Sequence, residues 1–388
     1  MVRFAHLADV HLGGWKQPEM QELNFKAFQK AVEACIKERP EFILIAGDLF
    51  DSAYPPIEIL KDAFAEFRKI KEARIPVFII AGSHDSSASG KTFLDVLERS
   101  GFCKNVENYQ YREIEDKIVL TPFVHEGIAL YGYPGKRSGM EVQDLKKIRF
   151  DDAPGMMKIF MLHTTLDKVK GDLPIECVES DKLPHADYYA LGHIHIDYQY
   201  ENFVYPGPIF PNSFSELEDL EHGGFYIVNT DSETPMKRIS TKVKDVVKIS
   251  VHVKDASSAT DIILSELEKN DLSDKIVLLR ISGKLEHGKN SDIKFHNIEE
   301  FAKRRNAYFL LKNIHDLNSE ELELNVELEK SSDIELETIK QYCEQNPSEF
   351  NKLIPDLMNS LSISKQEDER TENFNVRVID EVKKVLNF

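Results

Sequence analysis

Nine polar residues in the first half of the chain could do chemistry, because each follows a short apolar run and together they form compact motifs. In chain order the motifs are D-x-H, G-D, G-S-H-D, a lone histidine and G-H-x-H. Carboxylates and neutral imidazoles together suit divalent ions such as manganese, iron or zinc, rather than calcium or thiolate chemistry. The residues are Asp9, His11, Asp48, Ser83, His84, Asp85, His163, His193 and His195.

The number of these candidate ligands favours two metal ions. One ion takes about four to six ligands. Without His84 and Asp85, six Asp/His candidates remain, and together with Ser83 they exceed that number. We therefore expect two ions that share a bridging carboxylate. Two ions roughly 3.5 to 4 Å apart can ionise a shared water and clamp the attacking and leaving oxygens of a phosphoester. The motifs thus predict phosphoester hydrolysis without a protein nucleophile.

The spacing of apolar residues predicts the elements that position these motifs. Strands alternate with amphipathic helices at the start of the chain, which is typical of an α/β layered domain, and short strands dominate further on. Because the carboxyl ends of parallel strands face one crevice, we expect the motifs that follow five of the strands to meet there. The expected strands are 4–8, 42–46, 77–81, 128–132, 159–162, 188–191, 203–205 and 225–228.

Three parts are expected along the chain. Residues 1–235 hold the motifs and end in the polar run NTDSETP, and residues 236–325 form a smaller α/β unit. Residues 326–388 begin with an acidic run and continue as helices, the last of which carries an apolar stripe. The terminal stripe consists of Val378, Ile379, Val382, Val385 and Leu386.

Composition and charge indicate a globular, cytoplasmic protein. The 388 residues include four cysteines without C-x-x-C spacing, so a disulfide framework is not expected. No apolar run approaches the roughly 18 residues of a membrane span, and the first residues lack the apolar stretch of a secretory signal. The net charge of −18 argues against a protein that coats nucleic acid through bulk electrostatics, although charge is balanced within residues 236–325.

The ordered set of motifs resembles the calcineurin-like metallophosphoesterases. Within that family, D-V-H-L-G at 9–13, G-D-L-F-D at 47–51 and G-S-H-D-S at 82–86 are similar to the SbcD, or Mre-eleven, branch of DNA double-strand-break repair nucleases. The resemblance implies a β-sandwich flanked by helices, a small α/β capping domain and a helical C-terminal tail. It also implies two Mn²⁺ ions and cleavage of DNA ends as a 3′-5′ exonuclease and single-strand endonuclease.

The same resemblance implies partners and a location. The partners are DNA, a second copy of the chain, and a coiled-coil ABC ATPase of the SbcC or Rad-fifty kind. The location is the nucleoid of a prokaryotic, archaeal cell, with no membrane contact.

The resemblance further implies a role for each motif residue. Asp48 would bridge the two ions, His84 would touch the scissile phosphate and assist the leaving oxygen, and Asp85 would orient His84. The first ion would be held by Asp9, His11, Asp48 and His195. The second ion would be held by Asp48, His163 and His193, with Ser83.

Two residues depart from the family pattern. The family usually has asparagine where this chain has Ser83, and a hydroxyl is shorter and a poorer ligand, so we expect the second ion to bind weakly or through a water. Some archaeal members have a second histidine where this chain, like bacterial members, has Asp51. That difference leaves the balance of exonuclease and endonuclease activity open.

Contacts with DNA and with the ATPase are expected outside the motifs. Two basic clusters in the capping domain are expected to position phosphates, with a solvated face as the alternative. The terminal stripe is expected to bind the coiled coil of the ATPase, and the alternative is that it packs on the chain's own core. The basic clusters consist of Lys237, Arg238 and Lys242, and of Lys303, Arg304 and Arg305.

Two other functions stay open on the sequence alone. A metallophosphoesterase for small nucleotide diesters would carry the same motifs, but it would have no use for a capping domain and a partner-binding tail. A DNA-end binding scaffold whose catalysis is impaired through Ser83 is the second, and the six retained Asp/His ligands argue against it.

Overall fold

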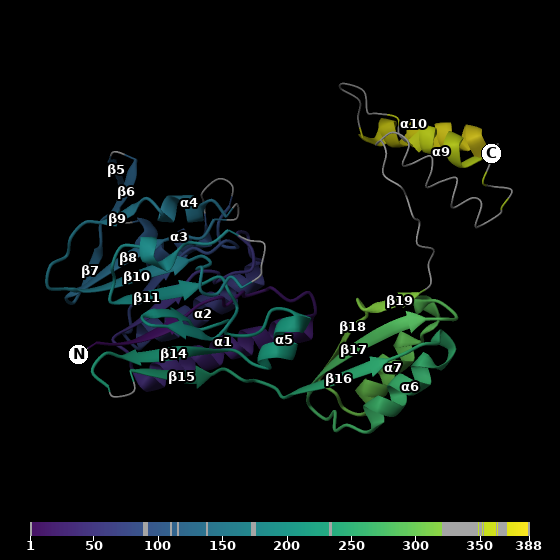
Figure 1. Ribbon diagram of the computed structural model, residues 1–388, viewed down its shortest axis with the longest axis horizontal. Helices are drawn as coiled ribbons and strands as arrows, with labels where there is room; N and C mark the ends of the chain where they lie inside the picture. Colours follow the sequence, from purple (N-terminus) through teal and green to yellow (C-terminus); the bar gives the residue numbers. More distant parts are fainter. Residues whose placement is uncertain are drawn as a thin grey trace. The chain divides into compact units, whose positions relative to one another are not determined.

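The structure is a computed structural model (Figure 1). It divides into two compact units, Met1–Asn318 and Ser319–Phe388. The residues that it describes are 2–87, 92–108, 111–114, 116–136, 139–171, 176–232, 235–319, 348, 351, 353–361, 363 and 371–386.

The first sheet carries the first three predicted strands. Its strands β1, β2 and β3 are parallel neighbours, so their carboxyl ends lie at one edge. A further parallel strand, β4, follows β3, whereas β14 and β15 are antiparallel and lie beyond β1. In spatial order the strands are β15 (Met236–Ser240), β14 (Gly224–Asn229), β1 (Arg3–Leu7), β2 (Phe42–Ala46), β3 (Val77–Ile80) and β4 (Lys104–Asn105).

The second sheet carries the later predicted strands. Its four central strands, β13, β11, β10 and β8, are parallel, and an antiparallel strand closes each edge. In spatial order the strands are β12 (Tyr198–Tyr200), β13 (Phe203–Tyr205), β11 (Tyr188–Gly192), β10 (Met157–His163), β8 (Ile128–Tyr133) and β7 (Phe123–His125). A small separate sheet consists of β5 (Tyr111–Ile114), β6 (Lys117–Leu120) and β9 (Ile148–Phe150).

The two large sheets pack face to face because alternate residues of each strand point to opposite sides. In β2, Leu44 packs with Ile80 and Met161 in the core between the sheets. Its neighbours Ile43 and Ile45 point the other way, into the core under the helices. Because both faces of these strands are buried, they are continuous apolar runs in the sequence.

Helices cover the outer face of the first sheet. The longest begins with Pro18 and ends at Glu38; the capping residue Arg39 adopts a left-handed conformation (φ 51°) before Pro40. Leu23 and Phe67 anchor the first two helices in the apolar core. The helices that contribute to this core are α1 (Pro18–Glu38), α2 (Ile57–Glu72), α3 (Phe93–Arg99) and α5 (Phe214–Leu220). Helix α4 (Glu141–Leu145) packs instead in the core of the second sheet, and two 3₁₀ turns are η1 (Val106–Asn108) and η2 (Ser180–Lys182).

A small α/β domain follows the sandwich. Its sheet is parallel through β16, β17 and β18, and α6 and α7 pack together on one of its faces (Figure 1). We predicted a boundary at 235/236, but β15 still belongs to the first sheet and the small sheet begins at Val246. The elements are β16 (Val246–His252), α6 (Ala256–Glu268), β17 (Ile276–Leu285), η3 (Asn290–Asp292), α7 (Phe295–Arg304), β18 (Phe309–Asn313) and β19 (Leu317–Ser319).

The second unit contains two described helices, α9 (Ile354–Leu361) and α10 (Thr371–Leu386), which pack against each other. The predicted fold class is therefore confirmed: a sandwich flanked by helices, a small α/β domain and a helical C-terminal part. None of the helices in the described ranges combines the length and the apolarity that a membrane span requires.

Candidate metal centre

The two sheets deliver polar side chains to one edge of the sandwich. The Asp9 carboxylate, just after β1, accepts hydrogen bonds of 2.9 and 3.2 Å from the backbone amide of His193, just after β11. The Asp48 carboxylate, just after β2, lies 3.1 Å from Nε2 of His163, the last residue of β10. Residues from opposite sheets therefore meet at the carboxyl ends of their strands, where an α/β fold builds its sites.

Two imidazoles face each other at the centre of this cluster. Nδ1 of His11 bonds a carboxylate oxygen of Asp51 at 3.0 Å, and Nδ1 of His195 bonds a carboxylate oxygen of Glu216 at 2.9 Å. Because a carboxylate only accepts, both Nδ1 atoms carry the proton. Each ring therefore directs Nε2 inward, and these two Nε2 atoms lie 3.1 Å apart. A proton shared between them, or a metal ion in its place, would bind both nitrogens.

A third imidazole, His163, is arranged in the same way. Its Nδ1 donates to the backbone carbonyl of Ala46 at 3.0 Å, and its buried Nε2 faces a carboxylate oxygen of Asp48 at 3.1 Å. Burial alone would lower the pKa of His163, but the charge of Asp48, the hydrogen bond to it and the charge of Asp9 raise this pKa to about 10. A proton at Nε2 therefore occupies the position that a metal ion would take.

The donor atoms of these residues fall into three overlapping groups. Within each group the candidate ligand atoms all lie within 4.8 Å of one another. A set of inward carboxylate oxygens and imidazole nitrogens fits a borderline-hard divalent ion. The groups are Asp9, His11 and His195; His11, Asp48 and His84; and Asp9, Asp48 and His163.

At this edge the backbone of several residues has positive φ angles, which residues other than glycine rarely adopt. The φ angles of Asp9, His11 and Asp48 are 50°, 47° and 48°, and that of His193 is 97°. Backbone hydrogen bonds between the first two loops, such as the 2.9 Å bond from the His11 amide to the Asp48 carbonyl, hold these turns. Such strain is typical of functional sites, where the surrounding structure fixes the ligands in advance.

Glycines allow the strands to approach the ligands closely. A Cβ atom on Gly82 would lie 2.1 Å from a carboxylate oxygen of Asp48, and one on Gly47 would lie 2.2 Å from Nδ1 of His163. Real Cβ atoms do not come this close to other atoms, so larger residues here would displace the ligands.

The predicted pairing of Asp85 with His84 is wrong. The buried Asp85 carboxylate accepts from the backbone amides of Leu49, Phe50 and Gly82, at 2.9 to 3.1 Å, and so ties the second motif loop to the third. Burial, followed by the nearby charge of Asp48, raises the pKa of Asp85 to about 6. The turn directs this carboxylate inward toward the amides, whereas the His84 ring points outward.

His84 is positioned by Asp51 instead. Nδ1 of His84 donates to the Asp51 backbone carbonyl at 2.9 Å, and the His84 amide donates to the Asp48 carboxylate at 2.8 Å. The side chain is 46% exposed, and its ring packs edge-on against that of His11. Because Nδ1 is engaged, only Nε2 of His84 can reach a bound substrate.

The two remaining predicted ligands lie beside Asp48 and His163. The Ser83 hydroxyl donates to an Asp48 carboxylate oxygen at 3.4 Å, and the His193 ring centroid lies 5.0 Å from that of His163. Burial, followed by the charge of His163, lowers the pKa of His193 to about 4. A neutral ring is the form that binds a metal ion.

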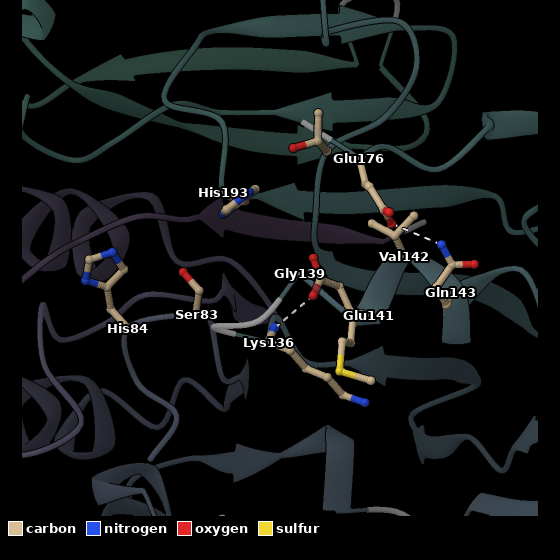
Figure 2. Close-up of a pocket in the computed structure, with 11 residues that line it drawn as sticks. Ser83, His84, Lys136, Gly139, Glu141, Val142, Gln143, Glu176 and His193 are labelled. Carbon is tan, nitrogen blue, oxygen red and sulfur yellow. Dashed lines mark hydrogen bonds between the residues drawn. The ribbon is translucent and has the colours of Figure 1, made fainter. Parts of the chain in front are cut away.

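A cavity of 650 Å³ opens next to these residues (Figure 2). Ser83, His84 and His193 line it on one side, and Lys136 and Glu141 lie across from them. A substrate in this cavity would contact His84 and the predicted ligands Ser83 and His193.

Three residues that the sequence did not reveal as partners support the cluster. Glu216 holds His195, Asp51 holds His11 and His84, and the Asn212 side chain donates to Asp51 at 3.2 Å. Orienting carboxylates of this kind fix the tautomer of a ligating histidine and raise its basicity. The S-x-x-E pattern that ends at Glu216 predicts a helix start, but it carries no information about the contact with His195.

The predicted DNA-binding residues are largely engaged with carboxylates. Arg304 and Arg305 are exposed at the end of α7. The other four form ion pairs of 2.5 to 3.2 Å, which DNA phosphates would have to replace. The pairs are Lys237 with Glu38, Arg238 with Asp197, Lys242 with Asp245, and Lys303 with Glu300.

The terminal stripe lies on α10, where Ile379 is 52% exposed. The structure therefore leaves part of it uncovered within its own unit. Its binding to a partner stays a prediction.

Residues 2–197 match the model of the calcineurin-like phosphoesterase family. The DNA double-strand break repair protein Mre11 of Archaeoglobus fulgidus is 30% identical over 228 residues, which cover 54% of this chain and 50% of that protein. The Mre11 protein of Methanocaldococcus jannaschii is 26% identical over 316 residues, or 76% of each chain. The uncharacterized metallophosphoesterase YhaO of Bacillus subtilis is 29% identical over 277 residues, which cover 66% of this chain and 64% of that protein. The match therefore covers 50% of the length of the Archaeoglobus protein and 64% of the length of the Bacillus protein.

Proposed function

The chain belongs to the calcineurin-like phosphoesterase family, and we propose that it is an Mn²⁺-dependent DNA nuclease that processes double-strand-break ends with two ions. Similarity to archaeal Mre11 proteins supports DNA as the substrate. Activity as a 3′-5′ exonuclease and as a single-strand endonuclease belongs to the same proposal.

One observation carries the proposal. Three imidazoles bind acceptors through Nδ1 and direct Nε2 inward, toward one another or toward the Asp48 carboxylate. Asp48 lies between the two ligand groups, 3.7 Å from Nε2 of His11 and 3.1 Å from Nε2 of His163. This central position suits a ligand shared by two ions. The first ion would be held by Asp9, His11, Asp48 and His195, and the second by Asp48, His163, His193 and Ser83.

The chain's own residues prepare the reaction. When bound, two divalent ions would supply an activated water and neutralise charge on the phosphodiester. His84 lines the cavity with only Nε2 free, so it would contact the scissile phosphate and donate to the leaving oxygen. Asp51 would hold His84 and His11 in fixed orientations for this step.

The proposal includes partners. Tyr54 and Ile57 are 68% and 78% exposed, and Tyr54, Phe93 and Val96 line a neighbouring cavity of 380 Å³. This apolar surface suits a second copy of the chain in a homodimer. The terminal stripe on α10 would bind a coiled-coil ABC ATPase of the Rad-fifty kind, and the two basic clusters would position DNA phosphates.

Cleavage of end-labelled DNA tests the proposal. Linear duplex and single-stranded DNA are incubated with Mn²⁺ and the wild type, Asp48→Ala or His84→Ala, and His315→Ala serves as a control because that histidine side chain is 90% exposed. We expect the wild type and the control to cut, and His84→Ala to lose about 10² to 10⁴ in rate while still binding Mn²⁺. The Asp48→Ala variant should lose both DNA cleavage and tight Mn²⁺ binding.

Two other outcomes would contradict the proposal. A wild type that leaves DNA intact but hydrolyses a small nucleotide diester would be a small-substrate phosphoesterase. A wild type that binds DNA ends and hydrolyses neither substrate would be a scaffold, and weak occupancy of the second site beside Ser83 would then explain the loss.

A further inference from the structure

The short helix α5 contacts both the metal centre and the small α/β domain. At its start, Glu216 accepts from Nδ1 of His195 at 2.9 Å and from the backbone amide of Asn212 at 2.8 Å. Ser213 caps the helix by accepting from the Glu216 amide at 3.2 Å and donating to its carboxylate. The carboxylate that orients a candidate metal ligand is thus fixed to the first turn of α5.

The opposite side of α5 is bound to the small domain. Glu218 accepts two hydrogen bonds from Arg280 of β17, 3.1 Å from Nε and 2.6 Å from Nη2. The same guanidinium lies 5.3 Å from the ring centroid of Phe214, the first residue of α5. At the end of the helix, Glu221 pairs with Lys248 of β16 at 2.8 Å. Bidentate arginine contacts fix geometry as well as charge, so α5 is held to the small domain in one orientation.

The loop before α5 reaches the second imidazole of the same ion site. Asn212 donates to the Asp51 carboxylate at 3.2 Å, and that carboxylate also bonds Nδ1 of His11 at 3.0 Å. A shift of α5 would therefore disturb the partners of both His195 and His11, whose Nε2 atoms face each other.

We propose that Arg280 is a positioning residue for the metal centre: it holds α5, and α5 holds His195 through Glu216. The position of the small domain is thereby coupled to the affinity of the ion site formed by Asp9, His11 and His195. The inference rests on the proposed function only in taking this cluster as a metal site. By reciprocity, an ion at His195 strengthens the contact between α5 and the small domain.

Mn²⁺ titration of the full-length protein without DNA, by isothermal calorimetry, tests the proposal. We expect Arg280→Ala to weaken Mn²⁺ binding about fivefold and Glu216→Ala, which removes the acceptor of the His195 Nδ1 proton, to weaken it about tenfold or more. Arg280→Lys, which keeps a cation for Glu218, should lie closer to the wild type. The matched control is Lys312→Ala, because Lys312 also pairs with a carboxylate, Glu299, and lies over a phenylalanine ring, but within the small domain.

A double variant distinguishes coupling from general damage. If the effect of Arg280 passes through Glu216, then Arg280→Ala should change Mn²⁺ affinity little when Glu216→Ala is already present. The single tryptophan gives an independent readout, because Nε1 of Trp15 donates to the Pro211 carbonyl, one residue before Asn212. Its fluorescence should therefore change in Arg280→Ala and remain unchanged in the Lys312→Ala control.

Three results would overturn the proposal: wild-type Mn²⁺ affinity in Arg280→Ala, an equal loss in Lys312→Ala, or fully additive losses in the double variant. A protein that binds Mn²⁺ but does not cut DNA would contradict the proposed function alone, because this test measures only the ion site.

Discussion

Replacing Asp51 with alanine should weaken Mn²⁺ binding without unfolding the protein. The Asp51 carboxylate accepts the Nδ1 proton of His11 at 3.0 Å, and His11 is only 2% exposed. Without that acceptor, a buried N–H group would lose its partner, at a cost of about 1 to 3 kcal/mol. Loss of an orienting partner of a ligating histidine weakens metal binding by about 10- to 100-fold, which is about 1.4 to 2.7 kcal/mol and agrees with that range.

Two features of the structure sharpen this test. In Asp51→Asn the amide oxygen can still accept from Nδ1 of His11, so the loss should stay below about tenfold. The contact from His84 goes to the Asp51 backbone carbonyl and survives both substitutions. Excess Mn²⁺ should therefore restore cleavage by Asp51→Ala. Calorimetric titration with Mn²⁺ measures the affinity, and wild-type affinity in Asp51→Ala would refute the reasoning.

Two further predictions concern a proton and a glycine. Because the pKa of His163 is raised to about 10, its ring carries a proton at pH 7 that an ion must displace. Mn²⁺ affinity should therefore rise with pH between 6 and 8, with release of about one proton; calorimetry in buffers of different ionisation enthalpy measures this release, and buffer-independent heats would contradict it. Gly82→Ala would place a Cβ 2.1 Å from the Asp48 carboxylate, so it should abolish tight Mn²⁺ binding and cost about 1 to 3 kcal/mol of stability. Gly155→Ala is the matched control: no atom lies within 4 Å of its added Cβ but its φ is 74°, so it should lower thermal stability through backbone strain and leave Mn²⁺ affinity unchanged, and equal Mn²⁺ affinity in the two variants would contradict this account.

The strands that carry the motifs were predictable because they are buried on both faces. The strand at 42–46 has the predicted bounds, and the strand at 77–81 ends one residue earlier, at Ile80. Among the strands that the sequence did not indicate, β4 and β9 have only two and three residues and lie at sheet edges. Runs that short have too few residues for a periodic pattern to be recognised.

Adjacency in sequence proved a poor guide to contacts between side chains at the site. Asp85 follows His84 directly, yet the turn sends its carboxylate to backbone amides of another loop. The orienting carboxylate of His195 comes from Glu216, 21 residues later. Likewise, Lys237 pairs with Glu38, 199 residues away, so a local count of charges cannot show whether a basic cluster is free.

The central proposal is that the inward-facing imidazoles hold two divalent ions. Anomalous scattering from crystals grown with Mn²⁺ tests this proposal most directly. The account predicts two peaks, one bounded by Asp9, His11 and His195 and one beside His163, with Asp48 contacting both. Absence of manganese from the cluster at saturating concentration, or a single ion that Asp48 does not contact, would contradict it.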